Sequence, residues 1–154
     1  MNKNDFIRDD EVLYRSVRGK YGEEYSYDNI GKLKISSEAF RDRERKPSVD
    51  RAELKESNPS LSKRNDTDGI ISLITADVRA IGTVKTKIQN TDTTVHAVDV
   101  IYDPIPENPA HSQIIVNPEF FGSKSKQRNV FKLLQLALAE LAEKNGWTLE
   151  PSVQ

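Results

Sequence analysis

The sequence predicts a single α+β domain in which a largely antiparallel sheet is combined with short helices and one long C-terminal helix packed on it. Its 154 residues are the length of one domain. Short segments rich in β-branched and aromatic residues recur along the chain, several with alternating polarity. Near the C-terminus, apolar residues at three- and four-residue spacing predict an amphipathic helix over residues 125–145. These residues are Val130, Phe131, Leu134, Leu138 and Leu141.

The beginning of the chain predicts a tail followed by two strands. Residues 1–10 are rich in charge and predict a flexible N-terminus, so the domain itself spans residues 11–154. Residues 11–17 are rich in β-forming residues and predict the first strand. Residues 32–36 alternate between polar and apolar side chains and predict a short, half-buried strand.

Short helical turns and a long loop are expected in the middle of the chain. Residues 37–40 predict a helical turn with Ser36 or Ser37 as its N-cap. Residues 51–56 predict one short helix. Residues 57–68 consist mainly of Ser, Asn, Asp, Pro and charged residues, a composition typical of a mobile loop.

The second half of the chain predicts a hairpin, further strands and the long helix. Thr75 is placed to cap a short helix that ends at Gly82. In the strand before the proline-rich segment, alternation puts His96 and Val98 on one face and Val95 on the other. The predicted strands cover residues 69–74, 83–88, 93–102, 111–116 and 148–151, with a hairpin turn at 89–92.

Composition excludes several classes of function. The chain has no cysteine, which excludes thiol catalysis, disulfides and cysteine-ligated metal centres. The net charge of −1 provides no global attraction to nucleic acid or to a membrane. The N-terminus has no apolar signal segment, and no apolar run approaches the roughly 20 residues that span a bilayer. We therefore expect a cytoplasmic protein without a membrane partner.

No metal site and no particular cofactor are predicted. His96 and His111 are the only histidines, and no short ligand spacing joins them. Asp99 and Asp103 are four residues apart and would share a strand face, so carboxylate binding of Mg²⁺ stays open as an alternative. Separately solvated carboxylates are the simpler interpretation.

The segment Asp103–His111 is the strongest candidate for a functional loop, because it holds three of the seven prolines and one of the two histidines. Each proline fixes its own φ and restricts the preceding residue, so the loop is stiff. It follows one predicted strand and precedes another, and we expect it at the edge of the sheet. His111 can act as a general base that Asp103 orients. The alternative is a structural loop, with Asn108 capping a helical turn that begins at Pro109.

A second candidate surface is basic. Lys124, Lys126 and Arg128 lie at the start of the predicted C-terminal helix, where cations oppose the helix dipole by a few tenths to about 1 kcal/mol. An acidic partner, such as a nucleic-acid backbone or an acidic protein face, would offset that cost. These three residues, together with Glu107 and Asn108 of the proline-rich loop, are therefore predicted to contact a macromolecular partner. Solvated cations on a frayed helix end are the simpler alternative.

A third set of residues resembles part of a known active site. Arg15 on the first strand and Ser36-Ser37 after the second resemble the Arg…Ser-Thr-Ser order of ADP-ribosyltransferases, where Arg and Ser organise the nicotinamide cofactor. The resemblance implies that Arg15, Ser36 and Ser37 bind a nucleotide. The third element of that family, a Glu-x-Glu turn, has no match in this sequence.

Four ordered segments also resemble a small uncharacterised family of bacterial proteins. They are Leu13-Tyr14-Arg15, Ile35 to Phe40 (ISSEAF), Ser48 to Arg51 (SVDR) and Asp103 to His111, and they span about two thirds of the chain. The resemblance implies a bacterial accessory protein of a defence or stress locus, whose partner is another protein of that locus. It implies no activity.

Two functions follow from the sequence as hypotheses. The first is a binding or adaptor module that contacts a macromolecular partner through the proline-rich loop and the adjacent basic surface. The alternative is a small hydrolase or nucleotide-acting enzyme that uses His111 with Asp103.

Overall fold

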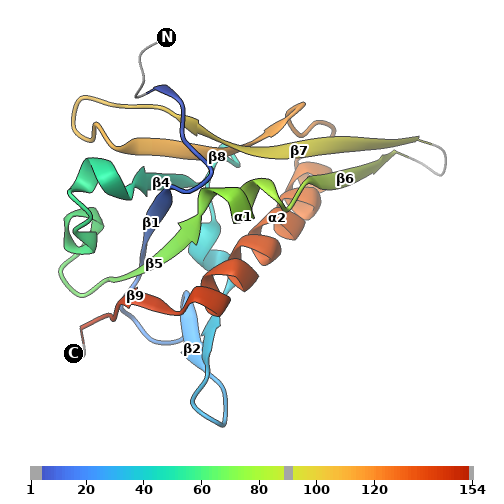
Figure 1. Ribbon diagram of the computed structural model, residues 1–154. Helices are drawn as coiled ribbons and strands as arrows, with labels where there is room; N and C mark the ends of the chain where they lie inside the picture. Colours follow the sequence, from blue (N-terminus) through green and yellow to red (C-terminus); the bar gives the residue numbers. More distant parts are fainter. Residues whose placement is uncertain (1–4, 89–91, 153–154) are drawn as a thin grey trace.

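A computed structural model describes residues 5–88 and 92–152 and confirms the predicted α+β fold. Its central sheet has seven strands in the order β6-β7-β8-β4-β1-β5-β9, and all neighbouring strands are antiparallel (Figure 1). A separate small hairpin pairs β2 with β3. The strands are β1 Val12–Val17, β2 Tyr25–Tyr27, β3 Leu33–Ile35, β4 Ser48–Arg51, β5 Gly69–Ile74, β6 Thr83–Ile88, β7 Asp92–Tyr102, β8 His111–Asn117 and β9 Trp147–Leu149.

The predicted long helix is confirmed as α2, Lys124–Asn145. The Ser123 side chain caps it by accepting a hydrogen bond from the Lys126 N–H at 3.1 Å. The helix ends at Gly146, whose φ of 73° favours glycine. The other helices are α1 Thr75–Arg79 and the 3₁₀ helices η2 Ser37–Phe40, η3 Ala52–Lys55 and η4 Pro59–Ser62. No helix of the described residues is long and apolar enough to cross a membrane.

Two hydrophobic clusters lie on the two faces of the sheet. Helix α2 covers one face (Figure 1). Leu134 and Leu138 are fully buried there, in one cluster with residues such as Leu13 and Leu73. The segment that carries η3 and η4 packs on the other face, over a smaller cluster centred on Tyr14. The strands therefore bury side chains on both faces, and the second face is only partly covered by apolar residues.

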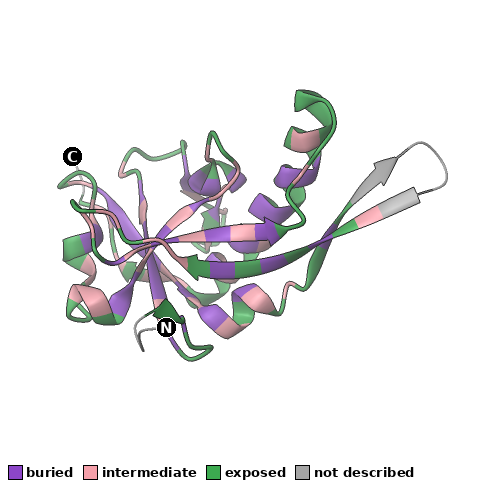
Figure 2. Ribbon diagram, turned by 90° about the horizontal axis from the view of Figure 1, so that it is seen from above, coloured by how far each residue is buried: buried purple, intermediate pink, exposed green. Residues whose placement is uncertain are grey.

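Strand β7 follows the predicted alternation. His96, Val98 and Val100 are buried, whereas Val95 and Ile101 are exposed, and this alternation is visible along the long strand in Figure 2. The hairpin turn predicted at 89–92 lies mostly outside the described residues. The sequence predicted that the proline-rich loop lies at the edge of the sheet, and this prediction is wrong. It joins β7 to β8, which are interior strands, because β6 pairs with the outer side of β7.

Three local features differ from, or add to, the predictions. Ile7, within the predicted flexible N-terminus, is 1% exposed and belongs to the core. Thr75 starts helix α1 and does not cap it, because its buried hydroxyl donates a hydrogen bond to the Glu11 carbonyl at 2.9 Å. Residues 57–68, predicted as a mobile loop, include the 3₁₀ helix η4, and Asp68 is 3% exposed.

Candidate functional site

A polar cavity of about 320 Å³ lies on the sheet face opposite α2. Side chains of β1, β4 and β8 form its floor, and the segment carrying η3 and η4 forms one wall. Glu107 and Asn108 of the proline-rich loop form the other wall. In Figure 1 this loop and the green helical turns after β4 lie at the same end of the sheet.

Strand register brings distant residues together on the cavity floor. Tyr14 pairs with Asp50, and Asp50 pairs with His111, so the three form a row across β1, β4 and β8. Because side chains alternate along a strand, Ser48 lies on the same face as Asp50. Asp103 follows β7 directly, and its N–H donates a hydrogen bond to the His111 carbonyl at 3.0 Å. The sheet thus places Asp103 beside His111, as the sequence-based hypothesis requires.

His111 lines the cavity with both ring nitrogens in polar contacts. Its Nδ1 lies 2.8 Å from the Asp103 carbonyl oxygen and 3.3 Å from the Asp103 carboxylate. Both neighbours are acceptors, so Nδ1 carries the proton in the neutral imidazole. Nε2 is then an acceptor, and it lies 3.0 Å from the Ser48 hydroxyl. The result is a Ser48–His111–Asp103 relay in which the serine hydroxyl donates to the histidine.

Asp50 joins the two walls of the cavity. Its Oδ2 accepts a hydrogen bond from the Ser62 hydroxyl at 2.7 Å, and its Oδ1 accepts one from the Asn108 side-chain amide at 2.7 Å. Ser62 belongs to η4 and Asn108 to the proline-rich loop. Both oxygens of this carboxylate are therefore used in holding two separate segments together, which indicates a structural task for Asp50.

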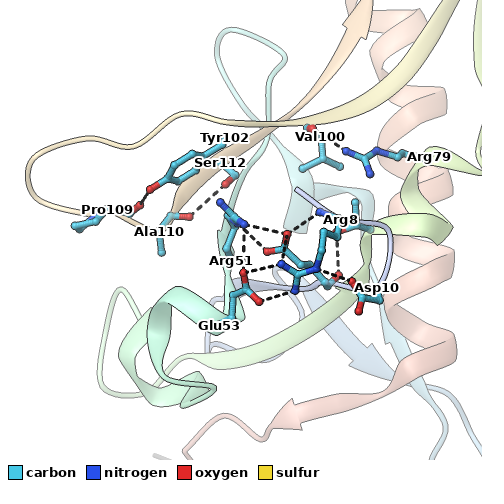
Figure 3. A network of polar contacts seen from close by, with 12 residues as sticks. Arg8, Asp10, Arg51, Glu53, Arg79, Val100, Tyr102, Pro109, Ala110 and Ser112 are labelled. Carbon is cyan, nitrogen blue, oxygen red and sulfur yellow. Dashed lines mark hydrogen bonds and ion pairs between the residues drawn. The ribbon is translucent and has the colours of Figure 1, made fainter. Parts of the chain in front are cut away.

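Further hydrogen bonds hold the proline-rich loop against the sheet (Figure 3). The Tyr102 hydroxyl donates to the Pro109 carbonyl at 2.6 Å, and the Arg51 N–H donates to the Ala110 carbonyl at 3.0 Å. The Arg51 guanidinium lies 4.8 Å from the centre of the Tyr102 ring and forms a buried ion pair with Glu11. The loop is thus supported from below by a buried polar network as well as being stiffened by its prolines.

Arg15 lines the cavity from β1 and is 6% exposed. Its guanidinium donates to three carbonyl oxygens, those of Ala39 at 2.6 Å, Ser48 at 2.6 Å and Arg41 at 3.2 Å. Burial, reinforced by the nearby positive charge of Arg64, lowers the pKa of Arg15 to about 10. Arg15 therefore fixes the backbone of Ser48 while carrying a charge that its hydrogen-bond partners do not neutralise.

The other residues predicted as sites lie away from this cavity. The Ser36 hydroxyl caps η2 by accepting from the Glu38 N–H at 3.1 Å. Ser37 is buried, and its hydroxyl accepts a hydrogen bond from Lys132 of α2 at 2.6 Å. Both serines thus hold η2 in place, and neither lines the cavity with Arg15.

The basic residues Lys124, Lys126 and Arg128 are exposed on the first turns of α2. Strand β8 runs from His111 to Asn117, and α2 begins after that far end. At about 3.3 Å per residue, the strand separates the two regions by roughly 20 Å. The structure therefore does not join these cations and the proline-rich loop into one continuous surface.

Sequence reasoning missed several residues of the cavity. Ser48 and Asp50 flank the apolar Val49, and this polar–apolar–polar order in a strand was the available signal for a polar sheet face. Lys63 and Arg64 come from the segment predicted as a mobile loop. Nothing in the local sequence indicates that this segment folds over β1.

A larger hollow of about 750 Å³ lies between α1 and α2. Its charged lining residues, such as Lys32, Asp77 and Glu140, alternate with Ala and Leu, and neither histidine contributes to it. We place the candidate site in the smaller cavity, because a histidine, a hydroxyl and a carboxylate meet there at hydrogen-bond distance.

No metal-binding cluster of three or more acidic or histidine side chains occurs within residues 5–88 and 92–152. Asp99, considered with Asp103 as a magnesium ligand, accepts a hydrogen bond from Arg79 at 2.8 Å. Comparisons with protein-family models, with curated proteins and with solved structures found no match.

Proposed function

We propose that this protein is a small hydrolase that cleaves esters, with Ser48 as nucleophile, His111 as general base and Asp103 as the group that orients the imidazole. The observation that carries the proposal is the 3.0 Å contact between the Ser48 hydroxyl and Nε2 of His111, made while Nδ1 faces the carbonyl and carboxylate of Asp103. This is the arrangement by which a histidine activates a serine for acyl transfer.

In the proposed reaction, the Ser48 oxygen attacks the ester carbonyl carbon and its proton passes to Nε2 of His111. The imidazolium then has its Nδ1 proton held by Asp103, and it returns the Nε2 proton to the departing alcohol as the carbon–oxygen bond breaks. Water, deprotonated by the same Nε2, hydrolyses the acyl-serine. The carboxylic acid leaves, and the Ser48 hydroxyl is restored.

Supporting contacts place the nucleophile on a rigid element. Ser48 is the first residue of β4, and Arg15 holds its carbonyl oxygen at 2.6 Å. Asp103 and His111 are neighbours across the β7–β8 hairpin. A site built on strands keeps the serine and the histidine in register without a substrate, as nucleophilic catalysis requires.

Labelling with a fluorophosphonate, which reacts with activated serines, tests this proposal. Intact-mass analysis should show one adduct, and peptide mapping should place it on Ser48. Ser48→Ala should abolish labelling, and His111→Ala should slow it about 10²- to 10⁴-fold because general-base assistance is lost.

Ser26→Ala is the matched control, because Ser26 is a half-buried serine of β2 outside the cavity. It should label as fast as the wild-type chain. The proposal is wrong if the folded wild-type protein stays unlabelled, if the adduct lies on another serine, or if His111→Ala reacts at the wild-type rate. Circular dichroism of each variant establishes that it is folded.

A second candidate function is binding of a macromolecular partner through the proline-rich loop. Pro104, Pro106 and Glu107 are exposed, while Asn108 is anchored to Asp50, so the loop presents a surface that loses little entropy on docking. Affinity purification from the native host, comparing the wild-type chain with Pro106→Ala/Glu107→Ala, tests this function. Loss of a specific partner with the loop variant supports it, and unchanged capture counts against it.

A further inference from the structure

The wall and floor of the cavity carry more positive charge than negative charge. Four cationic residues line it, namely Arg15, Lys55, Lys63 and Arg64. Within the part of the chain that the structure describes, none of the four has a carboxylate oxygen within 4.0 Å. Most other arginines of the fold, such as Arg8, Arg51 and Arg79, do form ion pairs.

The carboxylates of the cavity offset only part of this charge. Among the residues that the structure describes, the acidic ones that line it are Asp50 and Glu107, against four cations. Asp50 already accepts hydrogen bonds at both oxygens from Ser62 and Asn108, and Glu107 is exposed on the loop. The cavity therefore has an excess of two positive charges (four cations minus two carboxylates).

The burial of Arg15 makes the excess positive charge destabilising when no anion is bound. Taking a guanidinium out of water is unfavourable, its three carbonyl partners supply only dipoles, and the nearby Glu24 and Asp42 offset only part of that cost. Its lowered pKa reflects this desolvation. A bound anion in the cavity would stabilise the Arg15 cation, and the long side chains of Lys63 and Arg64 would strengthen the attraction.

We propose that the cavity binds a phosphate group carried by a small-molecule substrate. A dianionic phosphate matches the excess of two positive charges, and a cavity of about 320 Å³ has the size of a small-molecule site. The inference deepens and rests on the proposed hydrolase function. It identifies the substrate as an ester of a phosphorylated compound, with its phosphate among the cations and its acyl carbon at Ser48.

Titration calorimetry on the Ser48→Ala protein, with phenyl phosphate and inorganic phosphate as probes, tests the inference. Both probes should bind, with affinity that falls as salt is added. Lys63→Gln/Arg64→Gln should weaken binding at least tenfold, whereas Lys63→Arg, which keeps the charge, should retain it. Tighter binding of phenyl phosphate than of inorganic phosphate identifies an organic phosphate as the ligand.

The matched control is Lys124→Gln/Lys126→Gln, which removes two exposed cations at the far end of β8 and should leave binding unchanged. Absence of binding to the folded protein overturns the inference, and so does equal weakening by the control. Because Ser48→Ala cannot form an acyl-enzyme, the calorimetry is independent of fluorophosphonate labelling. If phosphate binds but Ser48 is not labelled, the cavity is an anion site and the hydrolase proposal is wrong. If Ser48 is labelled but phosphate does not bind, the hydrolase proposal stands and the phosphate site is wrong.

Discussion

At the scale of single residues, Arg15 connects three parts of the chain that the sequence keeps apart. Its guanidinium binds carbonyl oxygens at the end of η2, in the following loop and at the start of β4. The Phe40 ring lies 5.3 Å from the guanidinium carbon and covers it on one side. Arg15, which the sequence suggested as a nucleotide ligand, thus holds the Ser48 carbonyl oxygen and lines the cavity.

Replacing Arg15 with methionine should destabilise the fold. The substitution leaves three carbonyl oxygens without their donor, and each hydrogen bond to a charged group contributes about 1.5–3 kcal/mol. We expect the free energy of unfolding to fall by about 3 kcal/mol or more in guanidinium chloride titrations. The control is Arg18→Met, whose side chain is 55% exposed in surface ion pairs, and it should cost less than about 1 kcal/mol. Equal losses for the two variants would contradict this account of Arg15.

At the scale of elements, the cavity exists because a 3₁₀ segment and a hairpin loop meet over the sheet. Asp50 is the contact between them, since its two oxygens accept from Ser62 and from Asn108. The η3–η4 segment crosses β1 because β4 and β5, which it connects, flank β1 in the sheet. Each wall is therefore attached to the sheet at its ends and to the other wall through one side chain.

Asp50→Ala should loosen both walls and leave the sheet intact. Loss of two charge-assisted hydrogen bonds is expected to raise amide exchange in residues 57–68 and 104–110 by about tenfold or more. Exchange in the middle of β1 and β5 should stay as in the wild-type chain. Hydrogen exchange read by mass spectrometry measures both regions.

Asp66→Ala is the matched control, because Asp66 is an exposed acidic residue of the same segment. It should leave exchange in both walls unchanged. If Asp50→Ala also leaves amide exchange in the walls unchanged, or if exchange rises equally throughout the sheet, Asp50 does not hold the two walls together.

At the scale of the whole molecule, the two halves of the sequence are interleaved in one sheet. Strand β1 pairs with β4 and β5, β4 pairs with β8 from the second half, and β5 pairs with β9 near the C-terminus. Helix α2 then covers strands from both halves. Neither half has a complete core of its own.

Unfolding should therefore be a single cooperative transition. Far-ultraviolet circular dichroism reports the sheet and the helices. The fluorescence of Trp147 reports the packing of β9, because the centres of the Trp147 and Tyr25 rings lie 5.1 Å apart. Both signals should change at the same denaturant concentration, and a fragment of residues 1–68 alone should lack structure. Two separated transitions, or a folded fragment, would show that the chain contains independent subdomains.

Much of the fold could be predicted from the sequence because its signals are local. The spacing of Leu134 and Leu138 predicts α2, and the alternation around Val98 predicts which face of β7 is buried. The proximity of His111 to Asp103 was predicted as well. The position of the loop within the sheet was predicted wrongly, because strand order depends on pairings between residues far apart in sequence.

The sequence by itself thus determined the fold class, the long helix, the absence of cysteine chemistry and one candidate histidine with its carboxylate. Only the tertiary structure decided that Ser48 lies at Nε2 of His111, that Arg15 binds carbonyls, and that the η3–η4 segment brings cations over the same cavity. The physical reason is the sequence separation of the residues that interact. Helix spacing and strand alternation act over a few residues, whereas the cavity depends on the cross-strand register of β1, β4, β7 and β8, which the packing of the whole sheet sets.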